Sequence, residues 1–168
     1  SQSGYSTNTL AALDFMRSQG MDAVALTSNI EAPVKAHADI VLDYGVGVES
    51  VDFVTLGVQT LVEYLVLFGI YGGQALGTCD PDEVVQRLDD LDEAIRANAA
   101  MCKTAESYVQ DHLLELSEHV PAMVVGNGPN YGVAEEAALK LSETIKIPAM
   151  HYEGEEFVHG PEMQITPG

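Results

Sequence analysis

The sequence has few cysteines and few basic residues, and each shortage argues against a class of protein. Only Cys79 and Cys102 are present, and their spacing matches no common metal-ligand pattern. A chain of 168 residues that is 46% hydrophobic can build its own core without a disulfide, so we expect both thiols to be free. Seven Lys and Arg residues stand against 26 Asp and Glu residues, for a formal net charge of −19. This charge repels nucleic acids and anionic membranes, which we therefore exclude as partners.

Long uninterrupted hydrophobic runs are also absent. The longest run, residues 56–71, contains Gln59 and Glu63, which favours a buried core helix over a membrane span. Residues 1–4 have neither the basic start nor the apolar stretch of a secretory signal. We therefore expect a globular cytoplasmic protein.

Helix and strand patterns alternate near both ends of the chain. The first third predicts a helix, a strand, a short helix and a second strand, at residues 9–18, 22–28, 31–37 and 40–42. A later stretch predicts a strand, a turn and a helix, at residues 122–125, 126–130 and 131–146. In the last helix we expect one buried side, made of Val133, Ala137, Leu141 and Ile145. The alternation predicts an α/β fold with a mostly parallel sheet.

The middle of the chain reads as helical. Residues 50–73 predict one long buried helix that stops at the following glycines. A second helix begins with Asp80 as the N-cap and Pro81 in the first turn, and Glu83 can complete a capping box. We expect this helical stretch to reach about His119, with a break near Thr104.

The opening segment, residues 1–9, holds five Ser and Thr hydroxyls and one glycine just before a helix. Hydroxyls, close-lying backbone and helix-start amides together can hold a phosphate against an unfavourable overall charge. Ser and Thr also gather at helix starts for purely local capping reasons, so composition alone leaves both interpretations open.

The opening segment SQSGYSTNT resembles the SxSGxTxxT-type phosphate loop of the SIS (sugar isomerase) domain family. This family includes the isomerase domain of glutamine-dependent fructose-6-phosphate aminotransferase and the fructosamine-phosphate deglycases. The resemblance implies phosphate-binding roles for Ser1, Gln2, Ser3 and Ser6, where Ser6 replaces the commoner Thr.

Two downstream segments are similar to the family's EGALKLKE and GELKHGP motifs and occur in the same order: EEAALKLSE at 135–143 and EEFVHGP at 155–161. The resemblance implies that Glu143 is the base that moves a proton between the first two sugar carbons and that His159 assists ring opening. Helical spacing places Glu136, Lys140 and Glu143 on one polar face. Without the resemblance, an ordinary exposed Glu–Lys pair is the simpler interpretation.

The segment 47–55 resembles the family's G-x-E-x-x-x-x-x-T stretch, which lines the sugar pocket. We therefore expect Glu49 and Thr55, together with Glu136 and Lys140, to belong to the substrate pocket. A loop leading into a capped helix explains the same residues more simply. The family often has Lys where this sequence has Leu56. His151 and His159 among several glutamates match no common metal-ligand spacing, so we expect no metal site.

The resemblance implies a three-layer αβα, flavodoxin-like SIS fold, represented by two half domains joined by long helices. We expect residues 1–78 to form the second half of one SIS domain, 79–119 the connecting helices and 120–168 the first half of another. It also implies an enzyme for an amino- or keto-sugar 6-phosphate that needs no metal or organic cofactor and forms a homodimer with shared active sites. The alternative is a non-catalytic SIS sensor that binds a sugar phosphate, which needs only the loop.

Overall fold

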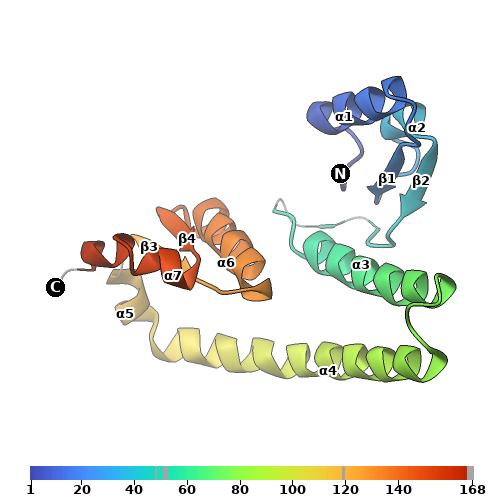
Figure 1. Ribbon diagram of the computed structural model, residues 1–168. Helices are drawn as coiled ribbons and strands as arrows, with labels where there is room; N and C mark the ends of the chain where they lie inside the picture. The colour runs from blue at the N-terminus through green and yellow to red at the C-terminus, as the bar shows by residue number, and fades with distance from the viewer. Residues whose placement is uncertain (48, 51–52, 119, 166–168) are drawn as a thin grey trace. The chain divides into compact units, whose positions relative to one another are not determined.

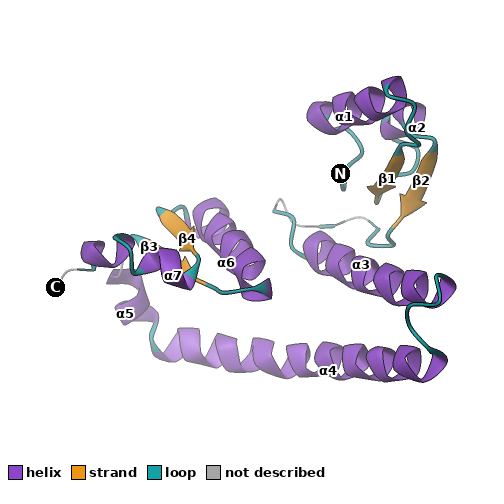
Figure 2. Ribbon diagram, viewed as in Figure 1, coloured by secondary structure: helices purple, strands orange, loops and turns teal. Residues whose placement is uncertain are grey.

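The computed structural model describes residues 1–47, 49–50, 53–118 and 120–165. The chain divides into two compact units, Ser1–Leu91 and Asp92–Gly168, and the division falls inside one long helix. Each unit holds a two-stranded parallel sheet with helices beside it (Figures 1 and 2). The predicted α/β class with parallel strands is confirmed.

The first unit opens with alternating helices and strands: α1 Thr7–Ser18, β1 Val24–Thr27, α2 Val34–His37 and β2 Ile40–Asp43. Strands β1 and β2 pair in parallel, from Val24 opposite Ile40 to Thr27 opposite Asp43. The core lies between these strands and the helices α1 and α2, and its buried members are Leu13, Ala23, Ala25, Ala32 and Val34. All four elements agree with the sequence prediction within a few residues.

Helix α3 spans Leu56–Ala75 and begins later than the predicted 50–73. Part of the predicted start, residues 51–52, lies outside the described residues. The prediction of a buried helix is wrong for this chain, because only Gly57 and Ile70 are buried in α3. Large apolar side chains on α3 are exposed instead: Leu56, Val62, Leu65, Val66, Phe68 and Tyr71. By length and composition alone, α3 also meets the requirements of a membrane span.

Helix α4 spans Pro81–Asp111 and starts at the predicted capping box. Asp80 Oδ1 accepts from the backbone N–H groups of Asp82 and Glu83, both at 2.9 Å, and Glu83 Oε2 accepts from the Asp80 N–H at 3.1 Å. The predicted break near Thr104 is wrong, since α4 continues through it and the helix is interrupted at His112. Helix α5 follows at Leu113–Glu118, and the predicted end at His119 lies outside the described residues.

The second unit contains β3 Ala122–Val125, α6 Pro129–Lys140, β4 Ala149–Tyr152 and the short helix α7 Gly154–Phe157. Strands β3 and β4 pair in parallel, from Ala122 opposite Ala149 to Val125 opposite Tyr152, and α6 packs against both. The predicted buried side of this helix is wrong. Ala134 and Ala138 are buried, whereas Val133 and Ile145 are 65% and 62% exposed.

The predicted single helix over 131–146 is also wrong at its end. After Lys140 the chain continues as one π-helical segment, η1 Leu141–Ile145, in which the Lys146 N–H donates to the Leu141 carbonyl at 3.1 Å. Lys146 then adopts a left-handed conformation with φ 62°. Single π turns inside helices occur frequently at functional sites.

Candidate functional site

The hydroxyl-rich opening loop is fixed at the carboxyl end of β1 by backbone contacts. The Gln2 carbonyl accepts hydrogen bonds from Thr27 Oγ1 at 3.0 Å, Ser28 N at 2.9 Å and Ser28 Oγ at 2.8 Å. Two residues on, the Gly4 carbonyl accepts from Val34 N at 3.1 Å. Ligands in open α/β sheets bind beyond the carboxyl ends of parallel strands, which is where this loop lies.

Gly4 allows the loop to pass close to the core. Its φ is +72°, in the region that favours glycine, and a Cβ added there would lie 2.6 Å from the Ala32 Cβ. The loop then enters α1 through Ser6, whose side chain makes no capping hydrogen bond to the helix in the described structure. The simple capping explanation therefore does not account for Ser6, and its exposed hydroxyl is available to a ligand.

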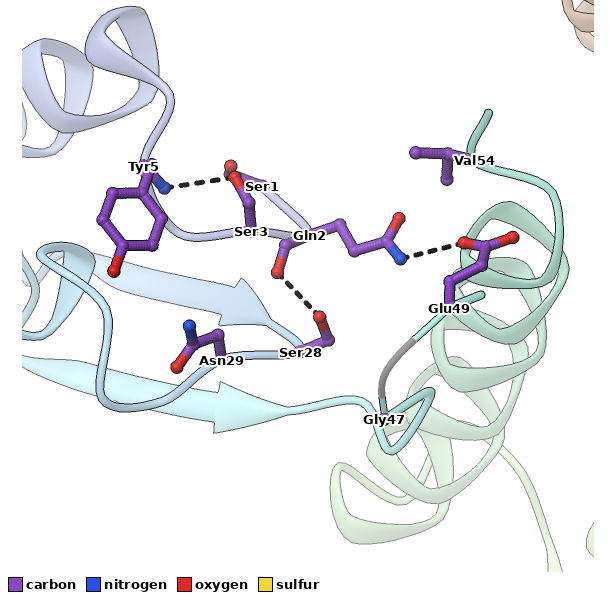
Figure 3. A pocket seen from close by; sticks show the side chains of 9 residues that line it. All are labelled: Ser1, Gln2, Ser3, Tyr5, Ser28, Asn29, Gly47, Glu49 and Val54. Carbon is purple, nitrogen blue, oxygen red and sulfur yellow. Dashed lines mark hydrogen bonds between the residues drawn. The ribbon is translucent and has the colours of Figure 1, made fainter. Parts of the chain in front are cut away.

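An open hollow of about 760 Å³ lies beside this loop (Figure 3). It is lined by Ser1, Gln2, Ser3, Tyr5, Ser28, Asn29, Gly47, Glu49 and Val54. Three of the four predicted phosphate-loop residues and Glu49 therefore share one hollow in the first unit. Ser6 and Thr55 are not among its lining residues.

Tyr5, Ser28 and Asn29 were missed by the sequence analysis. The signal for Ser28 and Asn29 was present, because small polar residues directly after a predicted parallel strand lie at the ligand-binding edge of the sheet. Tyr5 carries no comparable signal, since an aromatic residue inside a hydroxyl-rich loop has no pattern of its own.

Glu49 caps the first turn of α3. Its Oε1 accepts from Thr55 N at 2.7 Å, Thr55 Oγ1 at 2.9 Å and Leu56 N at 2.7 Å. Its Oε2 accepts from Gln2 Nε2 at 3.0 Å. The Gln2 hydrogen bond, followed by the Thr55 and Leu56 hydrogen bonds, lowers the pKa of Glu49 from 4.5 to about 2. Glu49 therefore lines the hollow and also serves the simpler capping role, in which Thr55 takes part, while the predicted substrate-pocket role of both residues stays a prediction.

In the second unit, Lys140 lies between two carboxylates. Its Nζ donates to Glu143 Oε2 at 2.6 Å and lies 3.3 Å from Glu136 Oε1. The Lys140 side chain is 21% exposed and each glutamate 34%, so this is not the freely exposed pair of the simpler interpretation. The hydrogen bond that Lys140 donates to Glu143 is the largest cause of the raised pKa of Lys140, and Glu136 adds to it. The structure thus brings together three predicted residues of one polar face.

The π-helical segment carries Glu143. Thr144 Oγ1 donates to the Lys140 carbonyl at 2.6 Å and Ser142 Oγ to the Ala138 carbonyl at 3.0 Å, so hydroxyls on both sides of Glu143 bond to the backbone of the preceding turn.

His159 is exposed and lies between α7 and the short 3₁₀ helix η2, Pro161–Gln164. Its backbone N–H donates to the Glu156 carbonyl at 3.2 Å. Across residues 120–165, no hydrogen bond or ion pair joins its ring to Glu136, Lys140 or Glu143. Glu153 caps α7 by accepting from the N–H groups of Glu155 and Glu156. Within the described ranges, no group of three or more His, Cys, Asp or Glu side chains is arranged to hold a metal ion.

Known proteins are similar to this chain over its whole length. Glutamine–fructose-6-phosphate aminotransferase (isomerizing) of Symbiobacterium thermophilum is 35% identical over 168 residues, which are 100% of this chain and 27% of that protein. The protein of the same name from Agrobacterium fabrum is 28% identical over 161 residues, 96% of this chain and 26% of its own length. No family model matches the sequence.

Solved structures share the fold. A protein named as a phosphosugar isomerase from Clostridium difficile 630 matches with a TM-score of 0.94 at 26% identity, over 99% of this chain and 47% of that one. The predicted resemblance of this chain to the SIS domain family is confirmed. The C-terminal domain of glucosamine-fructose-6-phosphate aminotransferase from Francisella tularensis has the same fold, with a TM-score of 0.88 at 23% identity over 98% of this chain. The chain spans about a quarter of its curated relatives and about half of these structures.

Proposed function

We propose that this SIS chain is the phosphosugar-handling part of a cytoplasmic enzyme that acts on an amino- or keto-sugar 6-phosphate. The reaction is an aldose–ketose isomerisation, a deamination or deglycation, or an amino transfer. The observation that carries the proposal is the hydroxyl-rich loop, which is anchored through the Gln2 carbonyl at the carboxyl end of β1 and lines a hollow. Relatives named for fructose 6-phosphate chemistry and for phosphosugar isomerisation support it.

The phosphate group is assigned to the opening loop. Ser1 and Ser3 supply hydroxyls in the hollow, and Ser6 supplies a hydroxyl at the first turn of α1, whose first amides have no partner within the helix. A phosphate must bind here despite the formal charge of −19. The nearby Glu49 does not present a free charge to it, because hydrogen bonds from α3 and Gln2 engage both carboxylate oxygens.

The proton transfers are assigned to Glu143 and His159. A general base needs a fixed position next to the carbon that it deprotonates, and the Lys140 bond at 2.6 Å fixes the Glu143 carboxylate. Glu136, on the other side of Lys140, forms an ion pair with it, with its Oε1 3.3 Å from the Lys140 Nζ. An imidazole can both accept and donate a proton through its ring nitrogens, which suits His159 for proton transfer to a ring oxygen.

Proton exchange at the first carbon of a ketose phosphate tests the reaction, because that carbon carries the hydrogen that the base removes, whereas the second carbon is the carbonyl. The full-length protein is incubated in D₂O with fructose 6-phosphate or a fructosamine 6-phosphate, and deuterium incorporation is followed by NMR. We expect exchange in the wild type and its loss in Glu143→Gln, with sugar-phosphate binding retained. Glu135→Gln is the matched control, because Glu135 is an exposed neighbour on α6.

The rival function is a non-catalytic SIS sensor that binds a sugar phosphate and regulates a partner. Binding without exchange across a panel of phosphorylated amino and keto sugars would support this sensor. The bonded group of Glu136, Lys140 and Glu143 favours the enzyme, because a sensor has no need of a positioned carboxylate base.

We also propose that the complete protein is a homodimer. The exposed apolar side chains of α3 require cover, and a second copy is a common source of it. Sedimentation velocity of the full-length protein tests this, and a monomer at micromolar concentration would contradict it.

A further inference from the structure

The Gln2 side chain extends across the hollow towards Glu49 (Figure 3). Its Nε2 donates to Glu49 Oε2 at 3.0 Å, the orientation that a carboxylate requires of an amide. Its Oε1 is buried without a hydrogen-bond partner in the described structure and packs against Gly57 of α3. A Cβ on Gly57 would lie 2.3 Å from this oxygen, so the carboxamide occupies space that only a glycine leaves open.

The other end of this connection is fixed to α3. Glu49 accepts from the backbone N–H groups of Thr55 and Leu56, both at 2.7 Å, and from Gly57 N at 3.3 Å. A carboxylate at a helix N-terminus is stabilised by these amides and by the helix dipole. Glu49 is therefore firmly attached to the first turn of α3.

The backbone of Gln2 is fixed to a different element. Its carbonyl accepts from Thr27 Oγ1 and from both the N–H and the hydroxyl of Ser28, at the end of β1. One residue thus connects the phosphate loop to β1 through its backbone and to α3 through its side chain.

We infer that Gln2 and Glu49 form a latch that holds the hydroxyl-rich loop in its phosphate-binding shape, and that the Gln2 side chain is a positioning group instead of a phosphate ligand. This inference rests on the proposed phosphate role of the loop. A loop held in its bound shape before the ligand arrives loses less conformational freedom on binding. The latch also keeps both oxygens of the Glu49 carboxylate bonded to donors.

A double-mutant cycle tests the latch, with inorganic phosphate and fructose 6-phosphate titrated into the full-length protein by calorimetry. We expect Gln2→Leu and Glu49→Ala each to weaken binding by about tenfold, the factor for one hydrogen bond to a charged group. The double variant should be no weaker than the weaker single variant, because both changes open the same latch. Additive losses would mean that Gln2 contacts the phosphate independently, and the latch would be overturned.

Gly57→Ala provides a second test that removes no polar group. The added Cβ displaces the Gln2 carboxamide, so phosphate binding should weaken about as much as in Gln2→Leu. Alanine is favoured over glycine inside a helix, so we expect the variant to fold. Gly69→Ala is the matched control, because the same change in the same helix meets open space.

The outcomes separate the two proposals. A wild-type protein that binds neither inorganic phosphate nor any sugar phosphate would remove the proposed function and, with it, the role of the latch. A wild-type protein that binds phosphate while Gly57→Ala binds equally well would overturn the latch and leave the proposed function intact.

Discussion

Gly4 lies against Ala32 so closely that a Cβ on Gly4 would be 2.6 Å from the Ala32 Cβ. Gly4→Ala should therefore lower the thermal midpoint and displace the phosphate loop, since Ala32 and the neighbouring Val34 belong to the buried core. We expect a loss about 1–3 kcal/mol larger than in Gly20→Ala, the usual range for overpacking. Gly20 is the control, because its φ of +74° imposes the same backbone strain in open space. Equal losses would contradict the close approach.

Glu49 should make the stability of the first unit depend on acid pH. Its pKa in the folded protein is about 2, below the ordinary 4.5, so the ionised form stabilises the fold. This contribution is complete above about pH 5 and is lost as the pH falls from 4.5 towards 2. The difference in thermal midpoint between wild type and Glu49→Gln should therefore shrink over this range. A difference that stays constant down to pH 2, or a carboxyl NMR titration near 4.5, would contradict the assignment.

Lys140 should act through Glu143. Lys140→Met removes the ammonium group that fixes the Glu143 carboxylate, and we expect proton exchange at the first carbon of the ketose to slow by about tenfold to a hundredfold. Sugar-phosphate affinity should change little, because the phosphate is assigned to the opening loop. Lys103→Met, an exposed position on α4, is the control. An unchanged exchange rate would show that Glu143 does not depend on its partner.

Tyr5 should help to distinguish a sugar phosphate from phosphate alone. Its ring lines the hollow and is 60% exposed, which leaves one face for the carbon–hydrogen surface of a sugar. We expect Tyr5→Ala to weaken sugar-phosphate binding by about threefold to tenfold and to leave inorganic phosphate binding unchanged. Tyr5→Phe separates the ring from its hydroxyl. Parallel losses for both ligands would indicate that Tyr5 supports the loop instead of the sugar.

The short elements of the first unit were predictable because local signals agreed with packing. Gly20 follows the end of α1 and Pro33 precedes the start of α2, as their residue types predict. The strand at Val24–Thr27 is a short apolar run typical of a parallel sheet. The capping box at Asp80 was predictable for the same reason, since a cap depends only on residues within one turn.

The buried side of α6 was not predictable from apolar spacing. Val133 and Ala137 lie on one face of the helix, and Ala134 and Ala138 lie on the neighbouring face, because each pair is four residues apart. A prediction from hydrophobicity chooses the face with the larger apolar side chains. Close packing on β3 and β4 instead buries the small side chains Ala134 and Ala138, which let the helix approach the strands. Which of two neighbouring stripes faces a sheet is decided by partners distant in sequence.

The candidate site shows the same division. The grouping of Glu136, Lys140 and Glu143 followed from helical spacing, and the structure confirms that they lie together. The engagement of Glu49 by Gln2, 47 residues away, has no local signal. The continuation of α4 through Thr104 was equally hidden. The Thr104 hydroxyl donates to the Ala100 carbonyl of the preceding turn, so this residue fits within an unbroken helix, and the interruption comes at His112 instead.

The widened turn at 141–145 has a consequence for the length of the chain between α6 and β4. Removing one residue there would restore ordinary helical bonding, and each later side chain would rotate by about 100° around the axis. The register of β4 beside β3 would then slip by one residue, which exchanges the two faces of a strand. A stretch that looks like tolerant helix surface in the sequence is therefore a place where homologous proteins with the same chemistry should carry no insertion or deletion.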